Sequence, residues 1–197
     1  MPLDQTVLVR FALCFLLGSV PFAVIAMQGT GIDILQAGSK NPGFNNVLRF
    51  SKWRAVLTLL GDFGKGSAAV LLIGQPGANL DMGWVYGFAV VLGHCYSPFL
   101  KFKGGKGIAT SAGVMLVLYP GWAAICLLVF TVLRVTGSKR RWLEAGTIAS
   151  LSSWLLFTAL MAVFGSDHDM VHSALMTLLL SWRHRSNFRI LMNRRAG

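Results

Sequence analysis

Basic residues in this chain gather in alternate connectors between long apolar stretches, and this alternation constrains the fold more than any single motif. Apolar stretches of about 20 residues are long enough to cross the roughly 30 Å hydrocarbon core of a bilayer as helices. Only 13% of the residues are charged, whereas soluble domains carry about 25%. We therefore predict a polytopic membrane protein and interpret the net charge of +11 as a sign of topology, not of nucleic-acid binding.

The charge of each connector indicates the side of the membrane on which it lies. Connectors rich in lysine and arginine are expected on the cytoplasmic side. Basic residues flank stretch 107–137 at both ends, so it is predicted to cross twice and to turn at Pro120-Gly121. Its first arm, 107–118, is short and is expected to form a tilted or shallow helix. The predicted spans are 3–27, 54–74, 82–100, the two arms of 107–137, 144–164 and 168–184.

These spans predict an all-α bundle of seven transmembrane helices, with the N-terminus outside and the C-terminus in the cytoplasm. Residues 1–197 are expected to form a single integral membrane domain. The first helix lacks the basic start and the cleavage site of a signal peptide, so we expect it to be retained. Cys14, Cys95 and Cys126 all lie in apolar stretches, which predicts buried thiols and no disulfide framework.

The segment Lys103-Gly104-Gly105-Lys106-Gly107 is a candidate anion site. Consecutive glycines let neighbouring N–H groups turn toward one point and form an anion-binding nest. A helix expected from Ile108 adds the positive end of its dipole, and Lys106 adds a full charge. Gly107 stands where a Walker A loop has Ser or Thr, so that loop is not predicted. A flexible basic turn without a ligand explains this motif equally well.

The segment 38–49 is a second candidate for phosphate binding. Ser39 and Asn46 carry hydrogen-bond donors, and Arg49 has a planar guanidinium that fits phosphate. Taken alone, this segment is better explained as a cytoplasmic turn followed by a helix cap.

His184 and Asn187 stand three residues apart near the basic end of the last predicted helix. They share one face if that helix continues so far. A histidine can accept a proton from a hydroxyl near neutral pH, and an asparagine can hold a hydroxyl or carbonyl in place. The alternative is that His184 is only an interfacial residue without a catalytic role. For His94 the corresponding alternative is a residue at a helix end that hydrogen-bonds the backbone.

Asp62 and Lys65 are charged residues within a predicted span. Ionisable groups at this depth are costly and are usually paired or functional. We expect a mutual ion pair that locks this helix to its neighbours, with His94 as a further supporting residue. No set of Cys and His residues has the spacing of metal ligands, so no metal site is predicted.

The sequence resembles the bacterial membrane glycerol-3-phosphate acyltransferases that use acyl phosphate as the donor. The resemblance runs nearly end to end and is most specific between Phe99 and Thr110. Other matching segments are Gly18–Phe22, Asp33-Ile34 before Gly38-Ser39, Asn46–Arg49, Asp62 with Lys65-Gly66, Gly93-His94 and His184–Asn187.

The resemblance implies an enzyme of the bacterial inner membrane whose active site faces the cytoplasm. It implies transfer of the acyl group from acyl phosphate to the 1-hydroxyl of glycerol 3-phosphate, the first step of phospholipid synthesis. The products are lysophosphatidate and phosphate, and no metal, cofactor or covalent acyl-enzyme is implied. The soluble enzyme that forms acyl phosphate is a candidate docking partner.

The resemblance also implies roles for individual residues. Family phosphate-binding positions fall on Ser39, Arg49 and Lys106, and His184 and Asn187 fall on positions that orient or activate the acceptor. Either a general base or the substrate's own phosphate accepts the proton, and the sequence leaves both open.

Several residues depart from the family pattern, chiefly in the expected acceptor pocket. They are Lys40 in place of Gly, Phe44-Asn45 in place of Ala-Thr, Glu144 in place of Ser and Ile190 in place of Arg. These departures leave an altered acceptor or lower activity as open alternatives. A non-enzymatic carrier of anionic lipids or metabolites is the alternative from another class, and the almost wholly apolar outer halves of the helices disfavour it.

Overall fold

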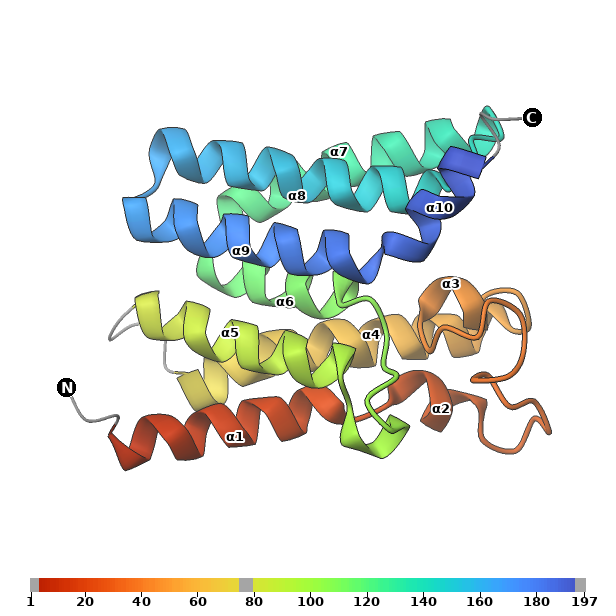
Figure 1. The fold of residues 1–197 in the computed structure, drawn as a ribbon, viewed down its shortest axis with the longest axis horizontal. Coiled ribbons are helices and arrows are strands. Elements are labelled where there is room, and N and C mark those ends of the chain that lie inside the picture. The colour runs from red at the N-terminus through yellow and green to blue at the C-terminus, as the bar shows by residue number, and fades with distance from the viewer. Residues whose placement is uncertain (1–3, 75–79, 194–197) are drawn as a thin grey trace. The chain divides into compact units, whose positions relative to one another are not determined.

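The structure, a computed structural model, describes residues 4–74 and 80–193, and every regular element in these ranges is a helix (Figure 1). The all-α prediction is therefore confirmed. Of the predicted span 3–27, residue 3 lies outside the described residues. Contacts divide the chain into two compact units, Met1–Leu118 and Tyr119–Gly197.

The first unit begins with α1 (Gln5–Ser19) and α2 (Phe22–Met27), which together form one candidate membrane span, Gln5–Met27, within the predicted range 3–27. Pro21 separates them because proline has no N–H to donate and its ring clashes with the preceding turn. The π-helix η1 continues α4, so that Lys52–Ile73 forms one apolar helix of 22 residues. The described helices of this unit are α1 (Gln5–Ser19), α2 (Phe22–Met27), α3 (Phe44–Val47), α4 (Lys52–Ala68), η1 (Ala69–Gly74), α5 (Leu80–Cys95), the 3-10 helix η2 (Pro98–Leu100) and α6 (Ile108–Leu118).

Two helix pairs in the first unit approach each other through glycines. α1 packs along α5, and α4 packs along α6. In the first pair the contact residues are Gly18 and Gly93, and in the second they are Gly66 and Gly113. At each of these positions an added Cβ would meet main-chain atoms of the facing helix. Glycine therefore permits the close backbone approach that small residues allow between membrane helices.

The second unit is built from longer helices joined by short turns. Pro120 begins α7, at the turn predicted for stretch 107–137. A capping box begins α9, in which Ser166 and Asp169 each accept a hydrogen bond from the other's backbone N–H, at 3.1 and 3.2 Å. The described helices are α7 (Pro120–Lys139), α8 (Ala145–Phe164), α9 (Asp167–Arg183) and α10 (Arg185–Asn193).

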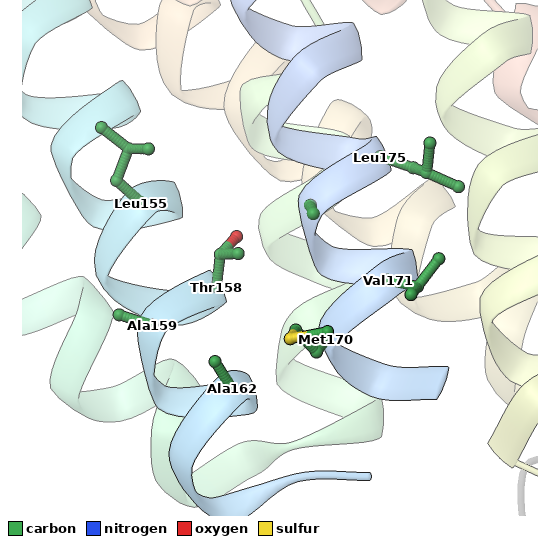
Figure 2. Close-up of a pocket in the computed structure, with 8 residues that line it drawn as sticks. Leu155, Thr158, Ala159, Ala162, Met170, Val171 and Leu175 are labelled. Atoms are coloured by element: carbon green, nitrogen blue, oxygen red, sulfur yellow. The ribbon is translucent and has the colours of Figure 1, made fainter. Parts of the chain in front are cut away.

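An apolar groove of about 510 Å³ lies between α8 and α9 (Figure 2). Leu155 and Ala162 line it from α8, and Met170 and Leu175 line it from α9. The hydroxyl of Thr158 lies 2.9 Å from that of Thr177, so the polar groups beside the groove are hydrogen-bonded to each other. The groove walls thus present mainly hydrocarbon.

Four described helices are long and apolar enough to cross a membrane. They are Gln5–Met27, Lys52–Ile73, Pro120–Lys139 and Ala145–Phe164. Helices also occupy the other three predicted ranges, as the 16-residue α5, the 11-residue α6 and the 17-residue α9. The short α6 agrees with the short first arm predicted for 107–137. The four long apolar helices and the similarity reported below make this a multi-pass membrane protein. Cys14, Cys95 and Cys126 are buried thiols outside any disulfide, as predicted.

Candidate functional site

A small apolar core supports the segment that carries Ser39 and Arg49. Its buried members come from α2, from the segment after it, and from α3 and α4: Ala23, Met27, Ile34, Val47 and Ala55. Arg54 donates hydrogen bonds to the carbonyl oxygens of Ala26 and Gln28, the second at 2.9 Å. The Arg54 guanidinium therefore caps the C-terminal end of α2 and stabilises the fold there. The polar segment 37–49, named the first loop below, follows on this base.

Asn46 holds the first loop together. Its Oδ1 accepts a hydrogen bond from the Ser39 N–H at 2.8 Å. Its Nδ2 donates to the carbonyl oxygens of Ile34 at 3.2 Å and Ala37 at 3.0 Å. The side chain is only 1% exposed and both amide protons are used, so Asn46 supports the loop, and its role in phosphate binding stays a prediction. The amide hydrogen-bonds main-chain N–H and carbonyl groups that a regular helix or strand would pair with each other.

The side chains of Ser39 and Arg49 remain exposed at the surface of the first loop. Gly38 adopts a φ of 58°, where a Cβ would also meet the Asn46 amide. Lys40 adopts a φ of 57°, a conformation that costs a non-glycine residue about 1 kcal/mol or more. Lys40 therefore has the left-handed backbone conformation that glycine adopts most easily.

The segment 103–107, named the glycine loop below, does not form the predicted nest at its two central glycines. The N–H of Gly104 donates to the Cys95 carbonyl at 3.2 Å, and that of Gly105 donates to the His94 carbonyl at 3.1 Å. These two donors therefore bind the end of α5. In this structure the two glycines serve close packing, and the role of their N–H groups in phosphate binding stays a prediction.

Gly105 is the point at which the first loop and the glycine loop meet. A Cβ there would meet the His94 imidazole and would lie 3.1 Å from the Pro42 carbonyl oxygen. At Gly104 it would meet the carbonyl of His94 and main-chain atoms of Cys95. Absence of a side chain thus lets two segments distant in the sequence lie against each other within the first unit.

The glycine loop ends where α6 begins. Gly107 has a φ of 84°, which favours glycine, and its carbonyl accepts the first helical hydrogen bond, from Ser111 at 2.8 Å. Lys106 is half-buried beside this helix start. A lysine charge and the positive end of the α6 dipole therefore lie together, which remains a suitable environment for an anion.

Asp62 forms the expected ion pair with Lys65, with 2.8 Å between Oδ1 and Nζ. The His94 Nδ1 lies 3.4 Å from the same Asp62 oxygen. Lys65 also donates to the Val20 carbonyl at 3.0 Å, next to the proline break between α1 and α2. Asp62, Lys65 and His94 thus connect α4 to the end of α1 and to α5. The His94 ring also lies next to Gly105 of the glycine loop.

In the second unit, His184 marks a break between two helices. α9 ends at Arg183 and α10 begins at Arg185, so the helix of the predicted span 168–184 does not continue unbroken to Asn187. One turn is nevertheless kept, because the Asn187 N–H donates to the His184 carbonyl at 2.8 Å. Both side chains are buried.

The ring of His184 has a defined orientation. Its Nδ1 lies 2.8 Å from the Leu180 carbonyl oxygen, which only accepts hydrogen bonds. The neutral imidazole therefore carries its proton on Nδ1, and Nε2 has the lone pair that can accept a proton. His168 and His172 lie near the other end of α9 and are separate from His184.

Glu144 contacts Asn187, a role that the sequence alone did not reveal. Its Oε2 accepts hydrogen bonds from the Asn187 Nδ2 and, at 3.0 Å, from the Thr147 hydroxyl. Glu144 immediately precedes α8 and is 43 residues from Asn187, so spacing gives no signal for this contact. The only signal was that Glu144 departs from the pattern of a resembled family.

Comparisons with known proteins agree over nearly the whole chain. The family described as glycerol-3-phosphate acyltransferase matches residues 8–194. The glycerol-3-phosphate acyltransferase of Pseudomonas syringae pv. tomato is 39% identical over 182 residues, which cover 90% of each chain. That of Bordetella petrii is 40% identical over 187 residues, which cover 92% of this chain and 87% of the relative.

A solved structure is similar throughout. It is PlsY (YgiH), described as an integral membrane glycerol 3-phosphate acyltransferase and solved in a glycerol 3-phosphate form and a lysophosphatidic acid form. The TM-scores are 0.84 and 0.82, with 30% sequence identity and coverage of 97% of this chain and 94% of that chain.

Proposed function

Because this chain belongs to the glycerol-3-phosphate acyltransferase family, we propose that it transfers an acyl group from acyl phosphate to the 1-hydroxyl of glycerol 3-phosphate. The products are lysophosphatidate and inorganic phosphate, and the reaction opens phospholipid synthesis. The contact of the glycine loop with the first loop at Gly105 and Pro42 carries the proposal, because it joins the segments bearing Arg49 and Lys106.

We also propose the topology and location of the enzyme. Seven helices cross the bacterial inner membrane, the N-terminus lies outside, and residues 1–197 act as one domain. The basic first loop, glycine loop and C-terminal segment then lie on the cytoplasmic side, which supports an active site that faces the cytoplasm.

Binding of the two substrates is the main task for the protein, because acyl phosphate is already an activated mixed anhydride. The glycerol 1-oxygen attacks the acyl carbon, the bond from that carbon to the phosphate oxygen breaks, and phosphate leaves. Both substrates are anions that repel each other. Arg49 and Lys106 offset this repulsion and hold the phosphates, with the Ser39 hydroxyl as a neutral donor, so that the reacting atoms meet.

His184 and Asn187 act on the acceptor hydroxyl. The Leu180 carbonyl holds the proton on Nδ1 of His184, which leaves Nε2 to take the proton from the attacking hydroxyl. Asn187 orients that hydroxyl. The departing phosphate can accept the same proton, so a His184→Gln variant that keeps substantial kcat would favour the phosphate as the acceptor.

The deciding experiment uses the purified full chain in lipid nanodiscs, with palmitoyl phosphate and labelled glycerol 3-phosphate. We expect labelled lysophosphatidate and an equal amount of phosphate. A family member from Pseudomonas syringae serves as the positive control. If that control is active and this chain forms no lysophosphatidate, the proposed function is wrong. Product formation only with a different phosphorylated acceptor would favour the alternative that the departures at Lys40 and Glu144 leave open.

A further inference from the structure

The side chain of Glu144 joins the start of α8 to the segment that carries Asn187. One carboxylate oxygen accepts hydrogen bonds from both the Asn187 amide and the Thr147 hydroxyl. Asn187 is 9% exposed and His184 is 3% exposed, so the amide is held in a largely buried setting. Glu144 therefore lies next to the residues proposed to act on the acceptor hydroxyl, although it is not one of them.

Glu144 immediately precedes α8, and its carboxylate lies at the N-terminal end of that helix. Glu144 adopts a left-handed conformation with a φ of 57° and a ψ of 34°, and its side chain makes no hydrogen bond that caps α8. The carboxylate still lies over the first turn of α8, where Thr147 stands, and negative charge is stabilised at a helix N-terminus. Two hydrogen bonds and a helix dipole thus hold one carboxylate in place.

The hydrogen bond from the Asn187 Nδ2 to Glu144 also fixes the position of the Asn187 Oδ1. A carboxamide is planar, with its oxygen and nitrogen on opposite sides of the same carbon. When Nδ2 donates to Glu144, Oδ1 lies on the other side of the amide carbon, where it accepts a hydrogen bond from the Ser186 hydroxyl at 3.4 Å. A carboxamide oxygen has two lone pairs and can accept two hydrogen bonds. That oxygen accepts hydrogen bonds, so it suits a hydroxyl proton and does not suit a phosphate oxygen.

We propose that Glu144 is a positioning residue, which fixes Asn187 so that its Oδ1 receives the acceptor hydroxyl and which repels phosphate from this position. The inference rests on the proposed function. A carboxylate and a phosphate are like charges and disfavour each other at short range. Glu144 would therefore select the orientation in which the hydroxyl end of glycerol 3-phosphate faces Asn187 and the phosphate end points away from it.

A double-mutant cycle in nanodiscs tests the positioning role. Glu144→Ala and Asn187→Ala should each lower kcat, by about 10- to 100-fold for Glu144→Ala, since small misplacements of reacting groups have effects of this size. The double variant should be no slower than Asn187→Ala, because Glu144 acts through Asn187. Glu144→Gln, which keeps an acceptor oxygen, should recover most of the lost kcat. The matched control Asp167→Asn removes an exposed carboxylate from the same unit and should leave kcat unchanged.

Inhibition by inorganic phosphate tests the repulsion separately from folding. Glu144→Gln keeps the shape of the side chain and removes its charge, so phosphate should inhibit it at a several-fold lower concentration than the wild type. An additive cycle, in which the double variant is slower by the product of the single losses, would overturn the positioning role. Unchanged phosphate inhibition would overturn the orientation role.

Amide exchange separates failure of this inference from failure of the proposed function. Wild-type protein that makes no lysophosphatidate contradicts the function, whereas the Glu144 contact can be measured without turnover. By NMR in nanodiscs, the Asn187 side-chain NH₂ should exchange with solvent at least tenfold faster in Glu144→Ala than in wild type. Equal exchange rates would show that the carboxylate does not hold this amide.

Discussion

The first loop and the glycine loop lie against each other at Gly105 and Pro42, but they are held in shape by opposite means. A side chain holds the first loop, because the Asn46 amide makes two hydrogen bonds to its backbone, at Ser39 and Ala37, and a third to Ile34 just before it. The glycine loop is held by its own backbone, through N–H groups bonded to the end of α5, and by the absence of side chains at Gly104 and Gly105.

The two loops agree in what they leave for a ligand. In each, amides that the sequence marks for phosphate help to build the loop, namely Asn46 in the first loop and the N–H groups of Gly104 and Gly105 in the glycine loop. Arg49 is exposed, and Lys106 is half-buried at a helix start. We therefore expect charge to contribute most to anion binding and the neutral amides mainly to fix the shape of the loops. Substitutions at five residues test this division between building and binding.

The largest effect is expected from Gly105→Ala. The new methyl group would meet the His94 ring and the Pro42 carbonyl, so the loops must separate or His94 must leave Asp62. We expect loss of both activity and most folded protein, measured by turnover and by size-exclusion yield in detergent. Gly64→Ala is the control, because open space surrounds that helical position and alanine should stabilise it by about 0.5–1 kcal/mol. Wild-type yield for Gly105→Ala would contradict the close contact.

Loss of charge should lower activity without affecting the fold. Lys106→Ala and Arg49→Ala are each expected to reduce kcat/KM by about 10²- to 10³-fold, the size seen when a preorganised electrostatic contact is removed. The Tm should stay within a few degrees of wild type, because Arg49 is exposed and Lys106 is half-buried. Lys52→Ala removes an exposed charge at the start of α4 and serves as the control. Comparable losses in all three variants would refute the assignment.

Asn46→Ala should show the reverse pattern. It leaves the Ile34 carbonyl, whose hydrogen bond is buried, and the partly buried Ser39 N–H and Ala37 carbonyl without their present partners. A fully buried unsatisfied group costs about 1–3 kcal/mol. We expect a clear drop in Tm, with turnover per folded molecule reduced less than in Arg49→Ala. A normal Tm with a strongly raised KM for glycerol 3-phosphate would instead restore Asn46 as a phosphate ligand.

The smallest effect is expected at Lys40. Glycine adopts its φ of 57° without the steric cost that a side chain has, so Lys40→Gly should stabilise the protein by about 1 kcal/mol, measured as a small rise in Tm. Lys40→Ala removes the charge but keeps the steric cost, so it should not raise the Tm. If both variants lower kcat/KM equally, the Lys40 charge takes part in substrate binding.

The sequence predicted the features that depend on composition and spacing. Polarity placed helices in all seven predicted ranges, and the three-residue interval between Asp62 and Lys65 predicted their ion pair on one helix. Proline gave the turn at Pro120, where α7 begins. Each of these features arises from residues that are close in the chain or from an average over about 20 residues.

The sequence did not predict how the polar groups of the site are used. The partners of the Asn46 side chain and of the Gly105 N–H are main-chain N–H and carbonyl groups, which leave no mark in a sequence. Glycines needed for close packing also look the same as glycines needed for a nest. The contact between Glu144 and Asn187 joins two helices, so it too required the fold.

The ion pair within α4 has a consequence for how the chain enters the membrane. Asp62 and Lys65 lie one turn apart, so their charges can neutralise each other inside a single helix. A nascent α4 can therefore leave the translocation machinery for lipid before any later helix has been synthesised. His94 follows on α5 and joins the pair afterwards. The order of these residues in the chain therefore suits stepwise insertion. Lys65 neutralises Asp62 within α4 first, and His94 of α5 contacts Asp62 afterwards.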